Sequence, residues 1–115
     1  MHHRIFVYGT LMRGQVNHRL LAGAVCMGPH SAAPVFTLFN LGTYPGLVRG
    51  GATAVAGEVY RIDGATLRRL DELEEYPRLY GRVLIPTPYG GTWVYHYRGG
   101  IQGCRVIRSG DWRDL

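Results

Sequence analysis

Short apolar runs of strand length, separated by glycine and proline, recur along the chain. They are rich in valine, isoleucine, tyrosine and phenylalanine, the residues that favour a pleated, half-buried strand. Residues 92–97 alternate large side chains, and the sequence Tyr89-Gly90-Gly91 before them is a hairpin signal. The pattern predicts six strands, over residues 4–8, 34–40, 54–62, 81–86, 92–98 and 105–108.

Two segments have the periodicity of a helix. Residues 64–74 are the stronger candidate, with Asp63 as the predicted N-cap and Pro77 beyond the end. One face of this helix carries four apolar side chains, Ala65, Leu67, Leu70 and Leu73. Residues 15–24 are a shorter and weaker candidate. This pattern predicts an α+β domain, in which a small mixed β-barrel of about five to six strands is flanked by one or two short helices.

The length of 115 residues fits one domain, residues 1–115, with a single modest core. No stretch approaches the roughly 18 consecutive apolar residues of a membrane helix, and the chain starts directly with a strand pattern. We therefore expect a cytoplasmic protein with no membrane partner. The two cysteines, Cys26 and Cys104, lie far apart without metal-ligand spacing, so we expect both to be reduced and structural.

All 13 basic residues are arginine, and the net charge is +5. The lack of lysine excludes Schiff-base chemistry and a P-loop. A positive charge suits nucleic acid or an anionic small substrate, but the arginines are scattered, with Arg68-Arg69 the only adjacent pair. We therefore predict no nucleic-acid partner. A small barrel that binds nucleic acid through exposed tyrosine and tryptophan stays as an alternative, which salt-sensitive binding to single strands would support.

Several familiar kinds of chemistry lack their residues in this sequence. Neither Ser31 nor Ser109 lies in a Gly-x-Ser-x-Gly motif. The five histidines have no paired spacing with a third ligand, so no metal is predicted. Residues 9–14 lack the second glycine of a dinucleotide fingerprint, so no cofactor is predicted.

A glycine turn follows the first predicted strand. The residues Tyr8-Gly9-Thr10-Leu11 come directly after the apolar residues 5–7. Gly9 can adopt backbone angles closed to other residues, so the chain can turn sharply and direct successive N–H groups into one concavity that favours a carboxylate or carbonyl oxygen. The same sequence is also compatible with a plain turn.

Acidic residues gather at the C-terminal end of the stronger helix, namely Asp71, Glu72, Glu74 and Glu75. The helix dipole disfavours anions there. A carboxylate that is also partly buried and close to other acids has a raised pKa, as a general base or acid working near neutral pH requires. The alternative is a solvent-exposed acidic face that is balanced by arginines such as Arg68 and Arg78.

An ordered series of short motifs runs through residues 4–112. It comprises Tyr8-Gly9-Thr10-Leu11 with Gly14, Asn17-His18-Arg19, Tyr44-Pro45-Gly46, Gly57-Glu58-Val59-Tyr60, Leu70-Asp71-Glu72-Leu73-Glu74-Glu75-Tyr76-Pro77 and Tyr80-Gly81-Arg82. In order and spacing the series resembles the γ-glutamylcyclotransferase-like family. The resemblance implies a mixed β-barrel flanked by helices, and a γ-glutamyl amine or amino acid as the small-molecule substrate.

The resemblance also implies a reaction and a catalytic residue. The family's catalytic glutamate lies in a Leu-Asp-x-x-Glu segment, which maps the role of general acid and base onto Glu74. The implied reaction is an intramolecular aminolysis, in which the α-amino group attacks the γ-carbonyl and 5-oxoproline and a free amine are released. The backbone N–H groups of Tyr8, Gly9, Thr10 and Leu11 would bind the glutamyl part. We therefore expect Glu74 and the amides of residues 9–11 to line one pocket.

Three points stay open from the sequence. Tyr80 is a candidate for the pocket wall, or else a core aromatic. Glu75 stands where many family members have glycine, and its charge would raise the pKa of Glu74 or favour a cationic leaving group. The short chain also suits a non-catalytic small-molecule-binding protein on the same fold. For either function we expect a monomer or a homodimer.

Overall fold

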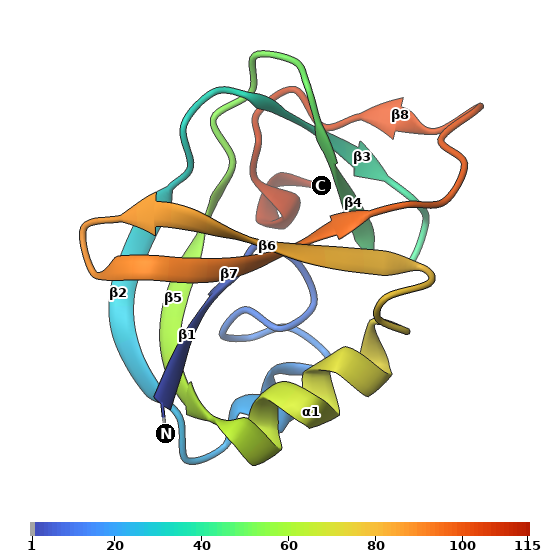
Figure 1. The fold of residues 1–115 in the computed structure, drawn as a ribbon. Coiled ribbons are helices and arrows are strands. Elements are labelled where there is room, and N and C mark those ends of the chain that lie inside the picture. The colour runs from blue at the N-terminus through green and yellow to red at the C-terminus, as the bar shows by residue number, and fades with distance from the viewer. Residues whose placement is uncertain (1) are drawn as a thin grey trace.

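The computed structural model describes residues 2–115, and Figure 1 shows its ribbon. Within these residues there are eight strands, one α-helix and two short 3-10 helices. In chain order the elements are β1 (His2–Val7), η1 (His18–Leu21), β2 (Val25–Ser31), β3 (Phe36–Asn40), β4 (Pro45–Arg49), β5 (Ala56–Asp63), α1 (Gly64–Leu73), β6 (Tyr80–Thr87), β7 (Gly90–Tyr97), β8 (Arg105–Val106) and η2 (Trp112–Asp114).

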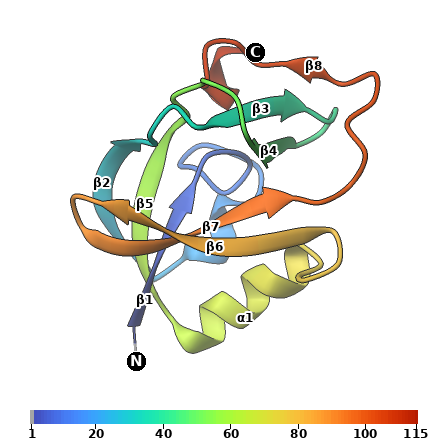
Figure 2. The ribbon, with the colours of Figure 1, turned by 45° about the horizontal axis from the view of Figure 1, so that its top comes forward.

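The strands form two sheets. The larger sheet has the order β2-β5-β1-β7-β6, and the smaller has the order β4-β3-β8. Strand β1 is central in the larger sheet, antiparallel to β5 and parallel to β7. Figures 1 and 2 show α1 on one side of the larger sheet and the smaller sheet on the side away from α1. The architecture is therefore a mixed α+β fold.

The predicted closed barrel is wrong. Both sheets end in edge strands, and among residues 2–115 no hydrogen-bonded ladder joins one sheet to the other. The prediction also omits two strands, β2 and β4. Strand β2 contains Gly28 and Pro29 and is largely exposed, and β4 begins with Pro45-Gly46, so neither has the apolar alternation of a half-buried strand.

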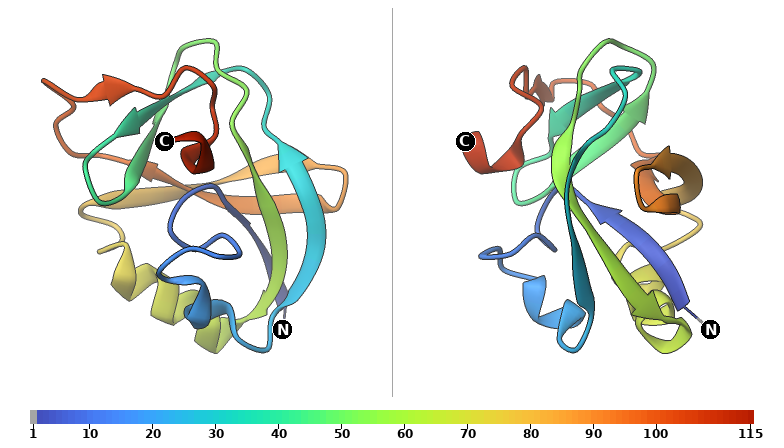
Figure 3. Two further views of the ribbon diagram at one scale, coloured as in Figure 1. Left: turned by 180° about the vertical axis from the view of Figure 1, so that it is seen from behind. Right: turned by 90° about the vertical axis from the view of Figure 1, so that its left-hand side faces the viewer.

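The continuous apolar run of β1 reflects burial on both faces of the strand. Ile5 and Val7 belong to a core cluster that includes Leu67 and Leu70 of α1. The alternate residue Phe6 packs with residues of the smaller sheet in a second cluster. Strand β1 ends at Val7, and the side view of Figure 3 shows the chain leaving the larger sheet between α1 and the smaller sheet. This placement puts the glycine turn in the middle of the molecule.

Helix α1 begins as its sequence predicts. The side chain of Asp63 accepts a hydrogen bond of 2.8 Å from the backbone N–H of Thr66, which is the geometry of an N-cap. The helix ends at Leu73, and Glu74 is its C-cap. The weaker candidate over residues 15–24 is only the short helix η1, between Gly14 and Gly23, which both have positive φ. Nowhere in residues 2–115 is there a helix of the length and apolar character needed to cross a membrane.

Candidate active site

A cavity of about 270 Å³ opens beside the end of β1. It lies between the glycine turn, the C-terminal end of α1, the start of β4 and the start of β6. All six residues that the sequence predicts for the site line this cavity, namely Tyr8, Gly9, Thr10, Leu11, Glu74 and Tyr80. The structure therefore places Glu74 and the residues of the glycine turn around one cavity. Their roles in catalysis and substrate binding stay predictions.

The glycine turn keeps its N–H groups unpaired. Its carbonyls are used, because Met12 N–H donates to Gly9 O at 3.1 Å and Asn17 N–H donates to Thr10 O at 2.9 Å. The Asn17 amide also donates to the Thr10 hydroxyl at 3.0 Å. Within the described residues, the N–H groups of Gly9, Thr10 and Leu11 donate to no protein acceptor. Successive unpaired N–H groups in a cavity are suited to a carboxylate or an oxyanion.

The glycine at position 9 has a different cause from the one predicted. Its φ lies outside the left-handed region, so the turn does not depend on backbone angles that only glycine can adopt. A Cβ at this position would instead stand 2.6 Å from Cγ of Pro45. Glycine is therefore required by the close approach of the Pro45 ring, which itself lines the cavity.

Neighbouring motif residues hold the turn in place. His18 Nδ1 lies 2.9 Å from the carbonyl oxygen of Leu11. Beyond the turn, Arg13 N–H donates to Glu58 Oε1 at 3.0 Å, and the hydroxyl of Tyr60 donates to the same oxygen at 3.0 Å. The motifs around His18 and Glu58 thus support the turn from two sides.

Glu74 is a half-buried carboxylate without a partner. No hydrogen bond or ion pair found among residues 2–115 involves its side chain, and burial raises its pKa to about 7. The neighbouring acids, which the sequence suggested as a further cause, are occupied elsewhere. Asp71 pairs with Arg82 at 2.9 Å, and the exposed Glu75 lies 3.5 Å from Arg78. Burial is therefore the physical cause of the raised pKa.

Three buried tyrosines surround Glu74 at the cavity, and each donates its hydroxyl hydrogen to a protein oxygen. Tyr8 donates to the backbone carbonyl of Tyr95 at 2.6 Å. Tyr80 donates to the backbone carbonyl of Pro45 at 2.8 Å. It lines the cavity and is also buried in the core, so both readings of this residue apply. Tyr95 donates to Asp71 Oδ1 at 2.6 Å. Burial is the main cause that raises the pKa of each hydroxyl, and the charge of Glu74 adds to it.

Tyr95 is a lining residue that the sequence reasoning missed. A signal for it exists, because the alternation in residues 92–97 sets Tyr95 on the same face of its strand as Trp93 and Tyr97. Which face of this strand meets the cavity depends on its parallel pairing with β1, at Ile5 and Trp93, and this pairing links distant parts of the chain.

The cavity lining contains no basic side chain. Its ionisable groups, apart from tyrosines, are the carboxylates Glu74 and Glu75. In the part of the chain that the structure describes, no three histidine, cysteine, aspartate or glutamate side chains come together as metal ligands would. The arrangement offers a proton acceptor, unpaired amides and apolar walls.

Comparison with known proteins assigns the family. The chain matches, over residues 5–114, the family described as gamma-glutamyl cyclotransferase, AIG2-like. The chain belongs to this family. The gamma-glutamylcyclotransferase family protein YtfP of Escherichia coli K12 is 48% identical over 111 residues, which cover 96% of each chain. The human gamma-glutamylaminecyclotransferase is 38% identical over 94 residues, covering 70% of this chain and 59% of the human one. These relatives support an enzyme of the cyclotransferase type.

Solved structures of similar proteins have the same fold. A protein of Pyrococcus horikoshii superposes with a TM-score of 0.85 at 30% identity, over 97% of this chain and 91% of the other. An AIG2-like protein of Mus musculus superposes with a TM-score of 0.81 at 30% identity, over 96% of this chain and 88% of the other. The family and the two-sheet α+β fold are thus mutually consistent.

Proposed function

We propose that this chain converts a γ-glutamyl amine or amino acid into 5-oxoproline and a free amine. The substrate's own α-amino group is the nucleophile, so the protein has to select the folded conformer, remove a proton and stabilise the oxyanion. Glu74 takes a proton from the α-ammonium group. The freed amine attacks the γ-carbonyl carbon, which forms an oxyanion and a positively charged ring nitrogen. Glu74 then delivers its proton to the leaving nitrogen as the C–N bond breaks and the carbonyl re-forms. The carboxylate that results accepts the second proton of the ring nitrogen and passes it to the released amine, which leaves as an ammonium ion.

In this proposal the glycine turn binds the negatively charged groups of the substrate. The unpaired N–H groups of Gly9, Thr10 and Leu11 bind the α-carboxylate or the oxyanion that forms at the γ-carbonyl. Apolar walls exclude water, so that the amine rather than water attacks.

One observation carries the proposal. A carboxylate with a pKa of about 7 and no protein partner shares a cavity with three unpaired backbone amides. A general base needs a pKa near the working pH, and a carboxylate in water titrates about three pH units lower. Family membership supports the same chemistry.

The experiment is a screen of γ-glutamyl compounds for 5-oxoproline release by wild type and Glu74→Gln. The proposal expects release by wild type and a loss of at least about a hundredfold in the variant, with the fold intact by circular dichroism. A non-catalytic binding protein would instead release no 5-oxoproline, and Glu74→Gln would bind the same compounds nearly unchanged.

A further inference from the structure

The Asp71 carboxylate lies one helical turn before Glu74 and receives three hydrogen bonds. Arg82 donates from Nε to Oδ1 at 2.9 Å and from Nη2 to Oδ2 at 3.1 Å. The Tyr95 hydroxyl donates to Oδ1 at 2.6 Å. A bidentate pair of this kind fixes both the position and the plane of the carboxylate. The guanidinium of Arg82 alone compensates the negative charge of Asp71. The hydrogen bond from Tyr95 is additional.

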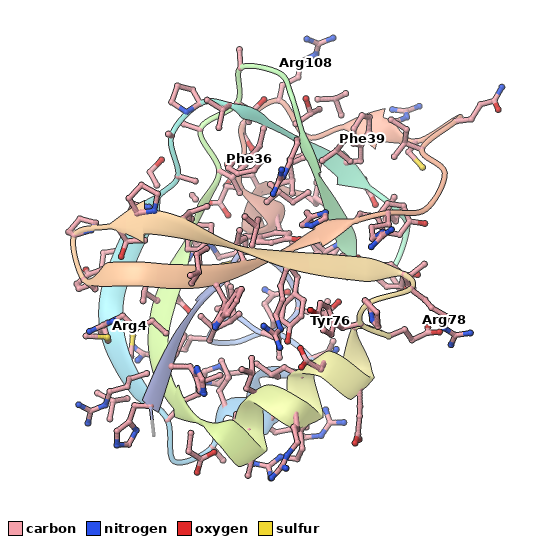
Figure 4. The ribbon with its side chains drawn as sticks, viewed as in Figure 1. Arg4, Phe36, Phe39, Tyr76, Arg78 and Arg108 are labelled. Atoms are coloured by element: carbon pink, nitrogen blue, oxygen red, sulfur yellow. The ribbon has the colours of Figure 1, made fainter. Side chains whose placement is uncertain are left out.

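Arg82 is itself fixed by two aromatic rings. Its guanidinium carbon lies 4.4 Å from the ring centre of Tyr76 and 4.4 Å from that of Trp93. Figure 4 shows Tyr76 between the end of α1 and the β6–β7 pair, whereas Arg78 extends away from the molecule. The side chains of Arg82 and Asp71 are only 16% and 18% exposed. Partial burial makes this pair stronger and more rigid than a surface ion pair.

The hydrogen bond to Asp71 determines what Tyr95 can offer to a ligand. A tyrosine hydroxyl has one hydrogen and two lone pairs. The hydrogen of Tyr95 is committed to a carboxylate that must accept, so the oxygen retains only acceptor capacity. Tyr95 lines the cavity together with Glu74. The Tyr95 side of the cavity therefore accepts hydrogen bonds, while the turn at residues 9–11 donates them.

A γ-glutamyl group has matching polarity, because its α-carbon carries a donor ammonium and an acceptor carboxylate. We infer that Asp71 is a positioning residue, which orients the Tyr95 hydroxyl so that its oxygen accepts a hydrogen bond from the substrate's α-ammonium group beside Glu74. This inference rests on the proposed function. It assigns the ammonium group to Tyr95 and Glu74, and it gives the buried Asp71–Arg82 pair a role in substrate recognition.

The test compares two ligands that differ only in the ammonium group. One is γ-glutamyl-propylamide, and the other is N-propylglutaramate, the same molecule without the α-amino group. Binding is measured by calorimetry in the Glu74→Gln background, where the proposed mechanism leaves the first ligand intact. Tyr95→Phe and Asp71→Asn are added to this background singly and together. The inference expects each to weaken γ-glutamyl-propylamide binding about tenfold and N-propylglutaramate binding less than about twofold. The double variant should lose little more than either single variant.

Matched controls come from the same kinds of contact away from the cavity. Tyr89→Phe removes a hydroxyl that donates to the backbone carbonyl of Pro29 at 3.1 Å. Asp111→Asn breaks a bidentate pair with Arg113, with contacts of 2.9 and 3.0 Å. Neither should change the binding of either ligand. If Asp71→Asn does not fold, Tyr95→Phe tests the contact with the ammonium group. Arg82→Lys, which keeps the charge but loses the bidentate geometry, then tests the positioning by Asp71 and should weaken the same ligand selectively.

The outcomes separate the inference from the proposed function. Equal weakening of both ligands by Tyr95→Phe would mean that Tyr95 only shapes the cavity, and it would overturn the inference. The same follows if the Glu74→Gln protein does not prefer the ligand with the ammonium group. The proposed function is judged independently, by 5-oxoproline release from wild type, and fails if there is none.

Discussion

Gly9 and Pro45 are in such close contact that a Cβ on Gly9 would lie 2.6 Å from Cγ and 2.8 Å from Cδ of the proline. The contact joins two motifs that lie far apart in the sequence. The carbonyl of Pro45 also accepts the Tyr80 hydroxyl at 2.8 Å, so the proline ring cannot retreat without disturbing a buried hydrogen bond. The position of the glycine turn is thus set by the start of β4.

Gly9→Ala should therefore destabilise the protein and misplace the turn. Real Cβ atoms do not approach other atoms so closely, and overpacking of this kind costs about 1 to 3 kcal/mol. Urea unfolding should show this loss, and KM should rise because the amides move. Gly64→Ala is the control, since a Cβ there meets no atom within 4 Å. If Gly9→Ala were as stable as this control, the contact would not be the reason for the glycine.

Glu74→Gln should make the protein more stable at neutral pH. The folded-state pKa of Glu74, about 7, is above the model value of 4.5, so the folded state binds this proton more tightly than the unfolded state. The destabilisation is absent below the unfolded pKa, grows as pH rises, and is complete above the folded pKa. The free energy of unfolding of the variant should exceed that of wild type by on the order of 1 to 3 kcal/mol at about pH 8, and by little at about pH 4. Urea unfolding at both pH values measures this, and a difference independent of pH would contradict it.

Glu75→Gly should stabilise the protein without changing the pH dependence of activity. Glu75 has a φ of 52°, a left-handed conformation that costs residues with a Cβ about 1 to 2 kcal/mol. Its pair with Arg78 is exposed and contributes little. Glycine loses more conformational entropy on folding than glutamate does, which offsets part of this gain. We therefore expect the free energy of unfolding to rise by about 0.5 to 1 kcal/mol, as measured by thermal or urea unfolding. The control Glu72→Gly, inside α1, should instead lose about 1 kcal/mol.

The cavity should favour leaving groups without a carboxylate. Its lining contains Glu74 and Glu75 and no basic side chain, so a carboxylate on the leaving amine would find no cation there. We expect kcat/KM to be higher for γ-glutamyl-propylamide than for γ-glutamyl-alanine. Glu75→Gln should reduce the ratio of these two kcat/KM values by about threefold at low salt. A ratio that favours γ-glutamyl-alanine would show that a cation reaches the leaving group from elsewhere.

The sequence predicts those parts of the molecule whose causes are local. The Asp63 cap and the amphipathic face of α1 both follow from residues close together in the chain. The glycine turn and the acidic helix end are likewise visible as motifs, and their order indicates that they belong to one site.

The features that the sequence analysis missed or misassigned depend on contacts between distant residues. The smaller sheet requires β4, which begins with a proline and a glycine and therefore lacks the sequence pattern of a strand. Without β4, the remaining predicted strands are compatible with one barrel. The contact between Gly9 and Pro45, and that between Tyr95 and Asp71, each join residues that lie far apart in the sequence. The sequence predicts that acidic neighbours help to raise the pKa of Glu74, but these neighbours are paired with arginines, and burial is the cause.

The most direct measurement is the titration of Glu74 alongside the pH dependence of kcat/KM for 5-oxoproline release. Because kcat/KM reports the ionisation of the free enzyme, a general base with a pKa of about 7 should make activity rise with pH through that value. An NMR titration of the Glu74 carboxyl carbon should have the same midpoint, and Glu74→Gln should lose at least about a hundredfold in activity. A carboxyl that titrates at its ordinary pKa, with activity that Glu74→Gln retains, would contradict the account.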